Sequence, residues 1–211
     1  SQTDLVVDIG AWQIYQGIHL NGVRAEVVKT FVLGTTSITS TSSAITLNRY
    51  SLNGALEKSV TLPGSHSPLY RAKAMTIPVV HDTVTMEDGR IFVAATIPAP
   101  NSTTDICVLA YDFDLNLKWQ KTYSYDDPLS PVDPYYDNDD AVAICTDQSP
   151  QFYIYGPDYN YVAVTGTSKS FSRGLDYVTI AYHKTDGQVL MPPKRFTSSG
   201  SHDDVPTDIA S

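Results

Sequence analysis

Acidic residues are densest between positions 126 and 140, in a stretch that also contains proline and tyrosine. Carboxylate oxygens at this density suit Ca²⁺, because this hard cation takes about six to eight oxygen ligands. The stretch lacks the central glycine and the closing glutamate of an EF-hand loop. A solvated turn between strands is the alternative interpretation. The candidate calcium ligands are Asp133, Asp137, Asp139 and Asp140.

Patterns that carry hydrolytic chemistry are missing from the sequence. It contains no Gly-x-Ser-x-Gly elbow and no His-Glu-x-x-His zinc helix. A carboxylate pair for glycoside cleavage stays open, but 23 acidic residues will always place some pair ~5–9 Å apart. The five histidines fall in predicted turns or in an N-terminal hairpin. We therefore predict no catalytic residue, and a glycan-acting enzyme remains an alternative.

One glycosylation sequon, Asn101-Ser102-Thr103, falls in a predicted loop. It makes Asn101 a candidate glycosylation site and favours a secreted protein. The stretch 35–43 consists almost wholly of serine and threonine, and we predict a loop there that could carry O-linked sugar.

Charge and cysteine content limit the partners and the cellular location. Asp and Glu total 23 against 14 Lys and Arg, a net charge of -9, so we expect no nucleic-acid partner. No stretch approaches the ~20 apolar residues needed to span a bilayer. The chain begins at Ser1, which suggests a processed protein or an excised region, and we expect an extracellular or cell-surface location. We interpret Cys107 and Cys145 as small buried hydrophobes, with a disulfide left open.

A pattern of short strands and turns recurs three times, which predicts an all-β fold. An apolar strand is followed by a second strand that ends on tyrosine, then by a hairpin turn, a further strand, and an acidic pair before the next strand. We predict one domain, 1–211, with an N-terminal strand and hairpin (1–29) outside the repeat and repeats at 30–87, 88–146 and 147–211. The hairpin turns are predicted at Asn53-Gly54, Asp114–Asn116 and Asp186-Gly187; a metal site at 112, 114 and 116 is the alternative for the second.

The third repeat resembles the β-propeller repeat found in tandem in large bacterial secreted and surface proteins. The resemblance rests on Val164-Thr165-Gly166, on 176–182, on Asp186-Gly187 and on Asp203-Asp204. It is best over 161–211 and weaker over 30–146. It implies tandem four-stranded antiparallel blades of β-propeller type, about three blades plus leftover strands. Pro192-Pro193 departs from the pattern and predicts an outer edge strand, because proline cannot donate to a ladder.

Three blades cannot close a ring, since closed propellers have at least about four. We predict that Val205–Ala210 is a strand that begins a new blade. The expected function is a non-catalytic structural or adhesive module that self-assembles head-to-tail through incomplete blades into a homopolymer, either a ring or a filament. A carbohydrate- or calcium-dependent binding module cut from a longer surface protein is the first alternative. Self-association is thus the expected partnership, glycans the second candidate, and calcium the one candidate cofactor.

Overall fold

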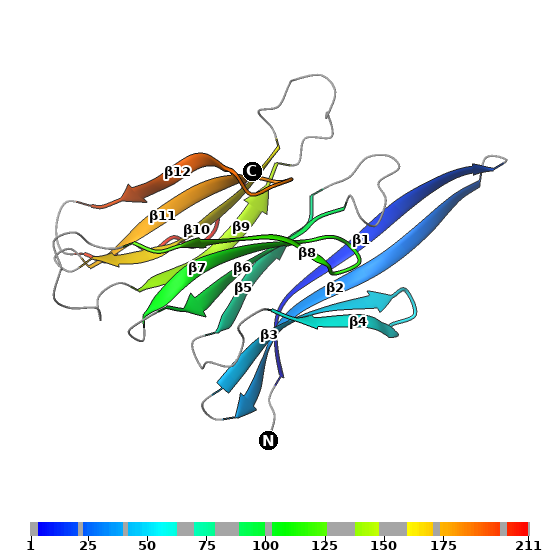
Figure 1. Ribbon diagram of the computed structural model, residues 1–211, viewed down its shortest axis with the longest axis horizontal. Helices are drawn as coiled ribbons and strands as arrows, with labels where there is room; N and C mark the ends of the chain where they lie inside the picture. The colour runs from blue at the N-terminus through cyan, green and yellow to red at the C-terminus, as the bar shows by residue number, and fades with distance from the viewer. Residues whose placement is uncertain are drawn as a thin grey trace.

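The computed structural model describes residues 4–20, 23–39, 42–62, 70–78, 89–99, 103–125, 138–147, 160–170, 174–198 and 202–210. For 4–20, 23–28, 36–39, 42 and 170 it describes the backbone alone. Strands and turns account for all regular structure in these ranges, which contain no helix (Figure 1). The same ranges accordingly hold no helix long and apolar enough to cross a membrane.

Three antiparallel sheets of four strands make up the described molecule, and strands adjacent in sequence are adjacent in each sheet. This confirms the predicted all-β fold. The first sheet contains β1 (Asp4–Leu20), β2 (Val23–Thr39), β3 (Ser42–Ser51) and β4 (Leu56–Thr61). The second contains β5 (Arg71–Thr76), β6 (Ile91–Pro98), β7 (Thr104–Tyr111) and β8 (Leu117–Tyr123). The third contains β9 (Asp139–Thr146), β10 (Tyr161–Ser170), β11 (Gly174–His183) and β12 (Val189–Phe196).

The N-terminal segment supplies β1 and the start of β2 in the first sheet. The hairpin expected within residues 1–29 is present, because β1 pairs with β2 antiparallel from Leu20 and Val23 onward. The short strand expected before it is not separate: it is continuous with the first arm of the hairpin in β1. The loop predicted at 35–43 is also wrong, because β2 continues to Thr39 and β3 begins at Ser42. The threonines in this stretch are β-branched and fit a pleated strand as well as they fit a loop.

The first strand of every sheet, here called the inner strand, carries a β-bulge at the same position. The hairpin pairs Thr30–Tyr50, Ile91–Tyr111 and Val162–Tyr182 align the three sheets. In that alignment the bulge falls at the same place in all three sheets. The bulged residue lies between the two inner-strand residues that pair with Leu33 and Gly34, with Ala94 and Ala95, and with Thr165 and Gly166. The bulged residues are Val7, Lys73 and Val142. A shared bulge shows that the sheets follow one plan.

The hairpin turns predicted from sequence are present. In the first two, an N–H donates across the loop, from Gly54 to Ser51 O and from Leu115 to Asp112 O, each at 2.9 Å. The donor residue has positive φ in both, +79° at Gly54 and 57° at Leu115, as three-residue hairpin loops require. Gly187, with φ +70°, takes this role in the third hairpin. The hairpin prediction for 112–116 is confirmed.

Successive sheets pack face to face around two apolar clusters. Alternate β6 residues serve different clusters: Ile91 and Val93 pack toward the first sheet, whereas Phe92 and Ala94 pack toward the third. Cys107 lies in the cluster between the first and second sheets. Cys145 lies on the face of the third sheet that points away from the second sheet. Both cysteines are buried and free, as the interpretation of them as small hydrophobes predicts.

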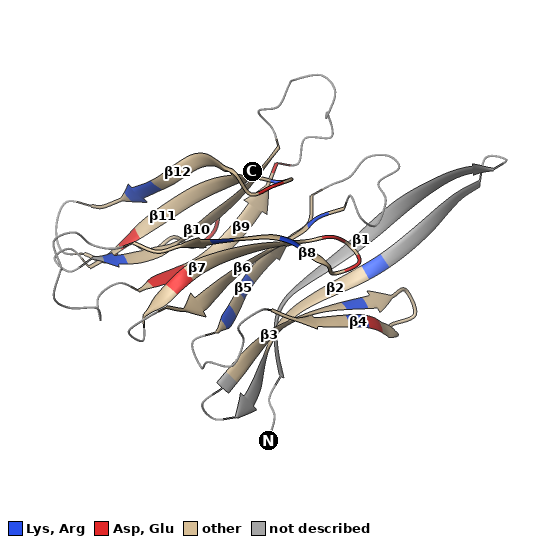
Figure 2. Ribbon diagram, viewed as in Figure 1, with Lys and Arg blue, Asp and Glu red and all other residues tan. Residues whose placement is uncertain are grey.

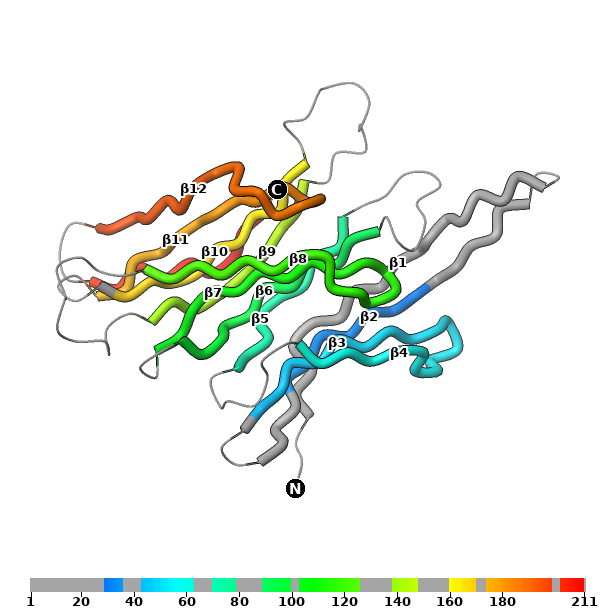
Figure 3. Tube along the Cα trace, in the orientation of Figure 1, coloured from blue at the N-terminus to red at the C-terminus, as the bar shows by residue number. Residues whose placement is uncertain are grey.

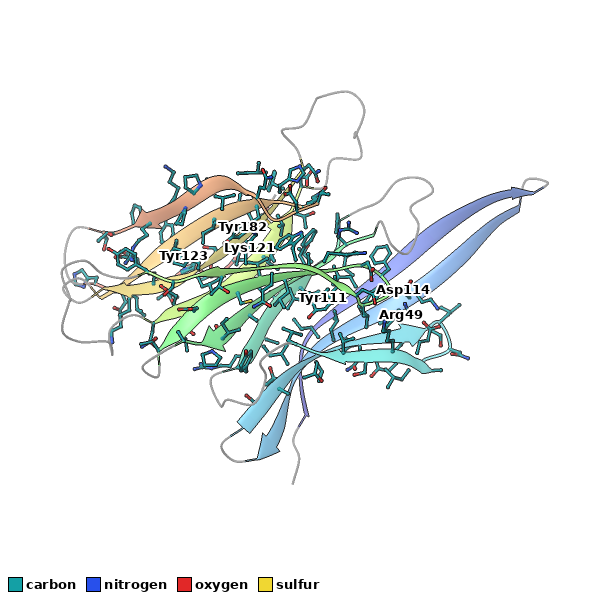
Figure 4. The ribbon with its side chains drawn as sticks, viewed as in Figure 1. Arg49, Tyr111, Asp114, Lys121, Tyr123 and Tyr182 are labelled. Atoms are coloured by element: carbon teal, nitrogen blue, oxygen red, sulfur yellow. The ribbon has the colours of Figure 1, made fainter. Side chains whose placement is uncertain are left out.

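The second and third hairpins each dock on the preceding sheet. Arg49 Nη1 of the first sheet donates to Phe113 O and to Asp114 Oδ1 in the second hairpin, both at 2.7 Å (Figure 4). Trp119 Nε1 of the second sheet donates to Lys184 O in the third hairpin at 2.9 Å. The same type of contact therefore fixes each sheet to the next.

One prediction for the third sheet and the segment that follows it is confirmed, and another is wrong. β12, which holds Pro192-Pro193, is an edge strand as predicted. The predicted strand at Val205–Ala210 is wrong: residues 202–210, here called the strap, form no ladder with any described strand. Asp204 N donates to Leu175 O at 2.6 Å, and Pro206 has no N–H to offer a ladder. Figure 3 shows this segment in red behind β10.

Candidate functional site

Polar side chains gather where the second and third sheets meet, and all of them except Arg195 are buried. Six strands, β7 to β12, each contribute one residue, and acidic and basic segments gather at this end of the sheets in Figure 2. The members are Asp105, Tyr123, Asp139, Ser168, Asp176 and Arg195. We call this group the polar joint.

Asp139 is the most enclosed acid of the polar joint. Its side chain is 0% exposed, and its Oδ2 accepts a hydrogen bond from Tyr125 N at 2.7 Å. Burial raises the pKa of Asp139 to about 7, and the nearby Asp105 charge adds to this rise. The Ser168 hydroxyl, the Tyr125 amide and the Arg195 charge all act in the opposite direction. Asp139 therefore changes its protonation state near neutral pH.

Arg195 supplies the positive charge of the polar joint. Its Nη2 lies 2.6 Å from Asp176 Oδ2 and donates to Ser168 O at 3.3 Å. The guanidinium carbon lies 3.6 Å from the centre of the Tyr125 ring, which is cation–π geometry. Asp176 is nearly fully buried, so this pairing stabilises a carboxylate that would otherwise be costly to enclose.

The geometry of the polar joint favours a structural role over a catalytic one. General acid–base catalysis needs a carboxyl group within hydrogen-bonding reach of a substrate. Asp139 has no exposed surface and directs one oxygen to a backbone N–H of its own chain. The raised pKa is therefore a consequence of packing one sheet onto the next.

The predicted calcium ligands are only partly within the described residues. Asp139 and Asp140 are neighbours on β9, and successive strand residues point to opposite faces. Asp140 Oδ1 lies 3.4 Å from Thr104 Oγ1, away from the enclosed position of Asp139. Asp133, Asp137 and Asn101 lie outside the described residues. The described part of the chain holds no group of three or more His, Cys, Asp or Glu side chains arranged for a metal ion.

Of the polar joint, only Asp139 was predicted as a site residue, and that as a calcium ligand, although the sequence carries a signal for two other members. Asp105 and Asp176 occupy equivalent positions, each six residues before the tyrosine that ends its strand. An acid repeated at the same place in a buried strand indicates a repeated polar contact. Ser168 and Arg195 carry no such signal, because Ser and Arg are ordinary residues at strand ends.

The strap repeats a contact that β9 makes. Asp139 Oδ2 accepts from the N–H of Tyr125, two residues after β8 ends, and Asp204 Oδ2 accepts from the N–H of Ser198, two residues after β12 ends; both distances are 2.7 Å. Further along, Ile209 packs against the cluster on the outer face of the third sheet. The strap therefore lies on the third sheet as β9 lies on the second.

Comparison with protein-family models gives no match to this chain, and comparison with curated proteins gives none either.

Proposed function

We propose that this chain is a non-catalytic structural module of the extracellular or cell-surface type, which self-assembles head-to-tail. Its three sheets are arranged in this proposal as blades of β-propeller type. The supporting observation is the shared plan of the sheets, with one inner-strand bulge and one hairpin contact at each step. A plan that repeats within the chain can be continued by the next chain.

The strap gives this continuation a direction. It packs on the third sheet as an inner strand packs on the sheet before it, and it has no second strand beside it among the described residues. Strands with free N–H and C=O groups are templates for further strands. A head-to-tail contact forms a ring if the rotation closes and a filament if it does not.

Particle mass in solution tests the proposed function. Sedimentation equilibrium on the intact chain, over concentrations from micromolar to about millimolar, should show mass rising in steps of one chain. A constant monomer mass across that range would overturn the proposal. Binding of a glycan without any change in particle mass would favour the binding-module alternative instead.

A further inference from the structure

The strap and the start of β1 have closely similar sequences. Residues 4–10 are Asp-Leu-Val-Val-Asp-Ile-Gly, and residues 204–210 are Asp-Val-Pro-Thr-Asp-Ile-Ala. Both begin with Asp, have Asp-Ile at the fifth and sixth places, and end on a small residue. The strap matches this half of β1 better than it matches β9, whose corresponding residues 139–145 are Asp-Asp-Ala-Val-Ala-Ile-Cys.

Residues 4–10 fill the inner-strand position of the first sheet. They pair with β2 from Thr36 back to Phe31, and their bulge falls where the bulge of β9 falls on β10. Asp204 and Ile209 of the strap correspond to Asp139 and Ile144 of β9. The strap thus carries both the sequence and the placement of an inner strand.

β2 offers the same acceptor features as β10. In the aligned sheets Gly34 corresponds to Gly166. A Cβ added at Gly166 would lie 2.3 Å from Asp140 O of the inner strand, so this close approach requires glycine. Glycine at the corresponding place in β2 leaves room for an inner strand at the same distance.

The outward faces of the first and third sheets carry smaller or more polar side chains than the faces that pack inside the chain. On the third sheet, Ala163 and Thr179 stand where the second sheet has Phe92 and Val108. On the first sheet, Thr46 and Asn48 stand where the second has Cys107 and Leu109. Polar outer faces suit units that are soluble alone and pack on one another reversibly.

We propose that the strap of one copy takes the place of residues 4–10 beside β2 of a second copy, so that the third sheet of the first copy packs on the first sheet of the second. This inference rests on the proposed function and names the strands that make the contact. Residues 4–10 and the incoming strap compete for one position, so the chain's own β1 limits assembly.

Removing the competitor tests this exchange. A variant lacking residues 1–10 should associate at least about tenfold more tightly than the intact chain, because the acceptor edge of β2 is then always open. Asp208 is exposed and corresponds to Ala143, which pairs with Thr165. Asp208→Pro in the truncated variant should abolish the gain, because proline removes the N–H at that place. A synthetic peptide of residues 202–210 should dissociate the oligomers, and the same peptide with Asp208→Pro should not.

The outcomes separate this inference from the proposed function. If truncation of residues 1–10 abolishes association that the intact chain shows, β1 is itself the joining strand; the inference is then wrong and the proposed function stands. If association is unaffected by the truncation or by Asp208→Pro, the inference is wrong in the same way. If neither form associates at any concentration, both are wrong.

A cross-linking measurement covers the case in which the truncated variant fails to fold. Val32 lies opposite Ile9 in β1, and Ile209 takes the place of Ile9 in the exchanged contact. A mixture of intact chains carrying Val32→Cys with others carrying Ile209→Cys, all with Cys145→Ala so that no free thiol lies beside position 209, should form a mixed disulfide dimer under mild oxidation. The control pairs Val32→Cys with Ala210→Cys, whose side chain faces away. Equal cross-linking in both mixtures would overturn the proposed register.

Discussion

Glycine at position 187 is required both by its backbone and by its surroundings. Its φ is +70°, and a Cβ there would lie 2.8 Å from Lys121 Cε and 2.9 Å from two carbons of the Trp119 ring. Gly54 has a similar φ of +79° but open space around the same position. The pair separates the cost of backbone strain from the cost of a steric clash.

We predict that Gly187→Val destabilises the fold more than Gly54→Val. Gly54→Val should cost about 1–2 kcal/mol through its backbone angle, and Gly187→Val at least about 1 kcal/mol more because the third hairpin must move off the second sheet. Denaturant titration of both variants measures the difference. Equal losses would mean that the ring and lysine move aside freely.

Asp139 gives the second prediction at this scale. Its pKa in the folded protein, about 7, lies above the ordinary value of 3.8, so the folded state holds this proton more tightly than the unfolded state does. The resulting stabilisation is present at acid pH and is lost as the pH rises from about 4 to about 7. Asp139→Asn keeps an acceptor for Tyr125 N and cannot ionise. The free energy of unfolding of Asp139→Asn, minus that of the unchanged chain, should rise across this range by on the order of 2–4 kcal/mol. A difference that is constant with pH would contradict this.

Among the structural elements, β12 shows how an exposed sheet edge is kept from pairing. It is an outer strand with Pro192 and Pro193 in its middle, and Val189, Leu190 and Phe196 are exposed along it. The prolines provide no N–H groups to an edge that carries these exposed apolar side chains. This edge of the third sheet is therefore poorly suited to pairing with another strand.

We predict that the double substitution Pro192→Val with Pro193→Val makes the chain aggregate. The new N–H groups would complete a pairing edge next to exposed apolar side chains. Light scattering during incubation at 37 °C should rise several-fold faster than for the unchanged chain. Substituting the exposed Leu52 and Leu56 of the first sheet by Val, which adds no N–H group, is the control and should change little.

Sequence patterns identified the elements better than their pairing. The turns at 53–54 and 186–187 and the edge position of β12 were predictable, because Asn-Gly, Asp-Gly and Pro-Pro each restrict the backbone locally. The hairpin within residues 1–29 was also predictable, whereas the pairing of residues 4–10 with β2 was not, because that pairing depends on contacts that no short pattern encodes. The strand predicted at Val205–Ala210 was wrong for a related reason. A strand needs a neighbouring strand to pair with, and an apolar composition does not show whether one is present.

The same distinction applies to the polar joint. Its members come from six strands, and only the packing of the second sheet on the third brings them together. The four acids predicted to bind calcium were chosen because they are close in sequence. One of them, Asp139, instead contacts residues that are distant from it in sequence.

At the scale of the whole molecule, the two cysteines lie at different faces of the stack of sheets. Cys107 packs between the first and second sheets, and Cys145 packs on the outer face of the third, which the strap borders. Burial raises the pKa of the Cys107 thiol to about 12 and raises that of Cys145 as well. The thiolate is the form that attacks an alkylating reagent, so neither sulfur reacts until its own face opens.

The alkylation rate of each cysteine therefore reports how often its own face of the stack opens. We predict that iodoacetamide modifies Cys145 well before Cys107, because lifting the strap exposes the first sulfur whereas separating two sheets is needed to expose the second. Mass spectrometry of digests taken over time would give both rates, and equal rates would show that the faces open together. In an assembled particle the alkylation rate of Cys145 should fall while that of Cys107 stays the same. The ratio of the two rates would then report when one copy has joined another.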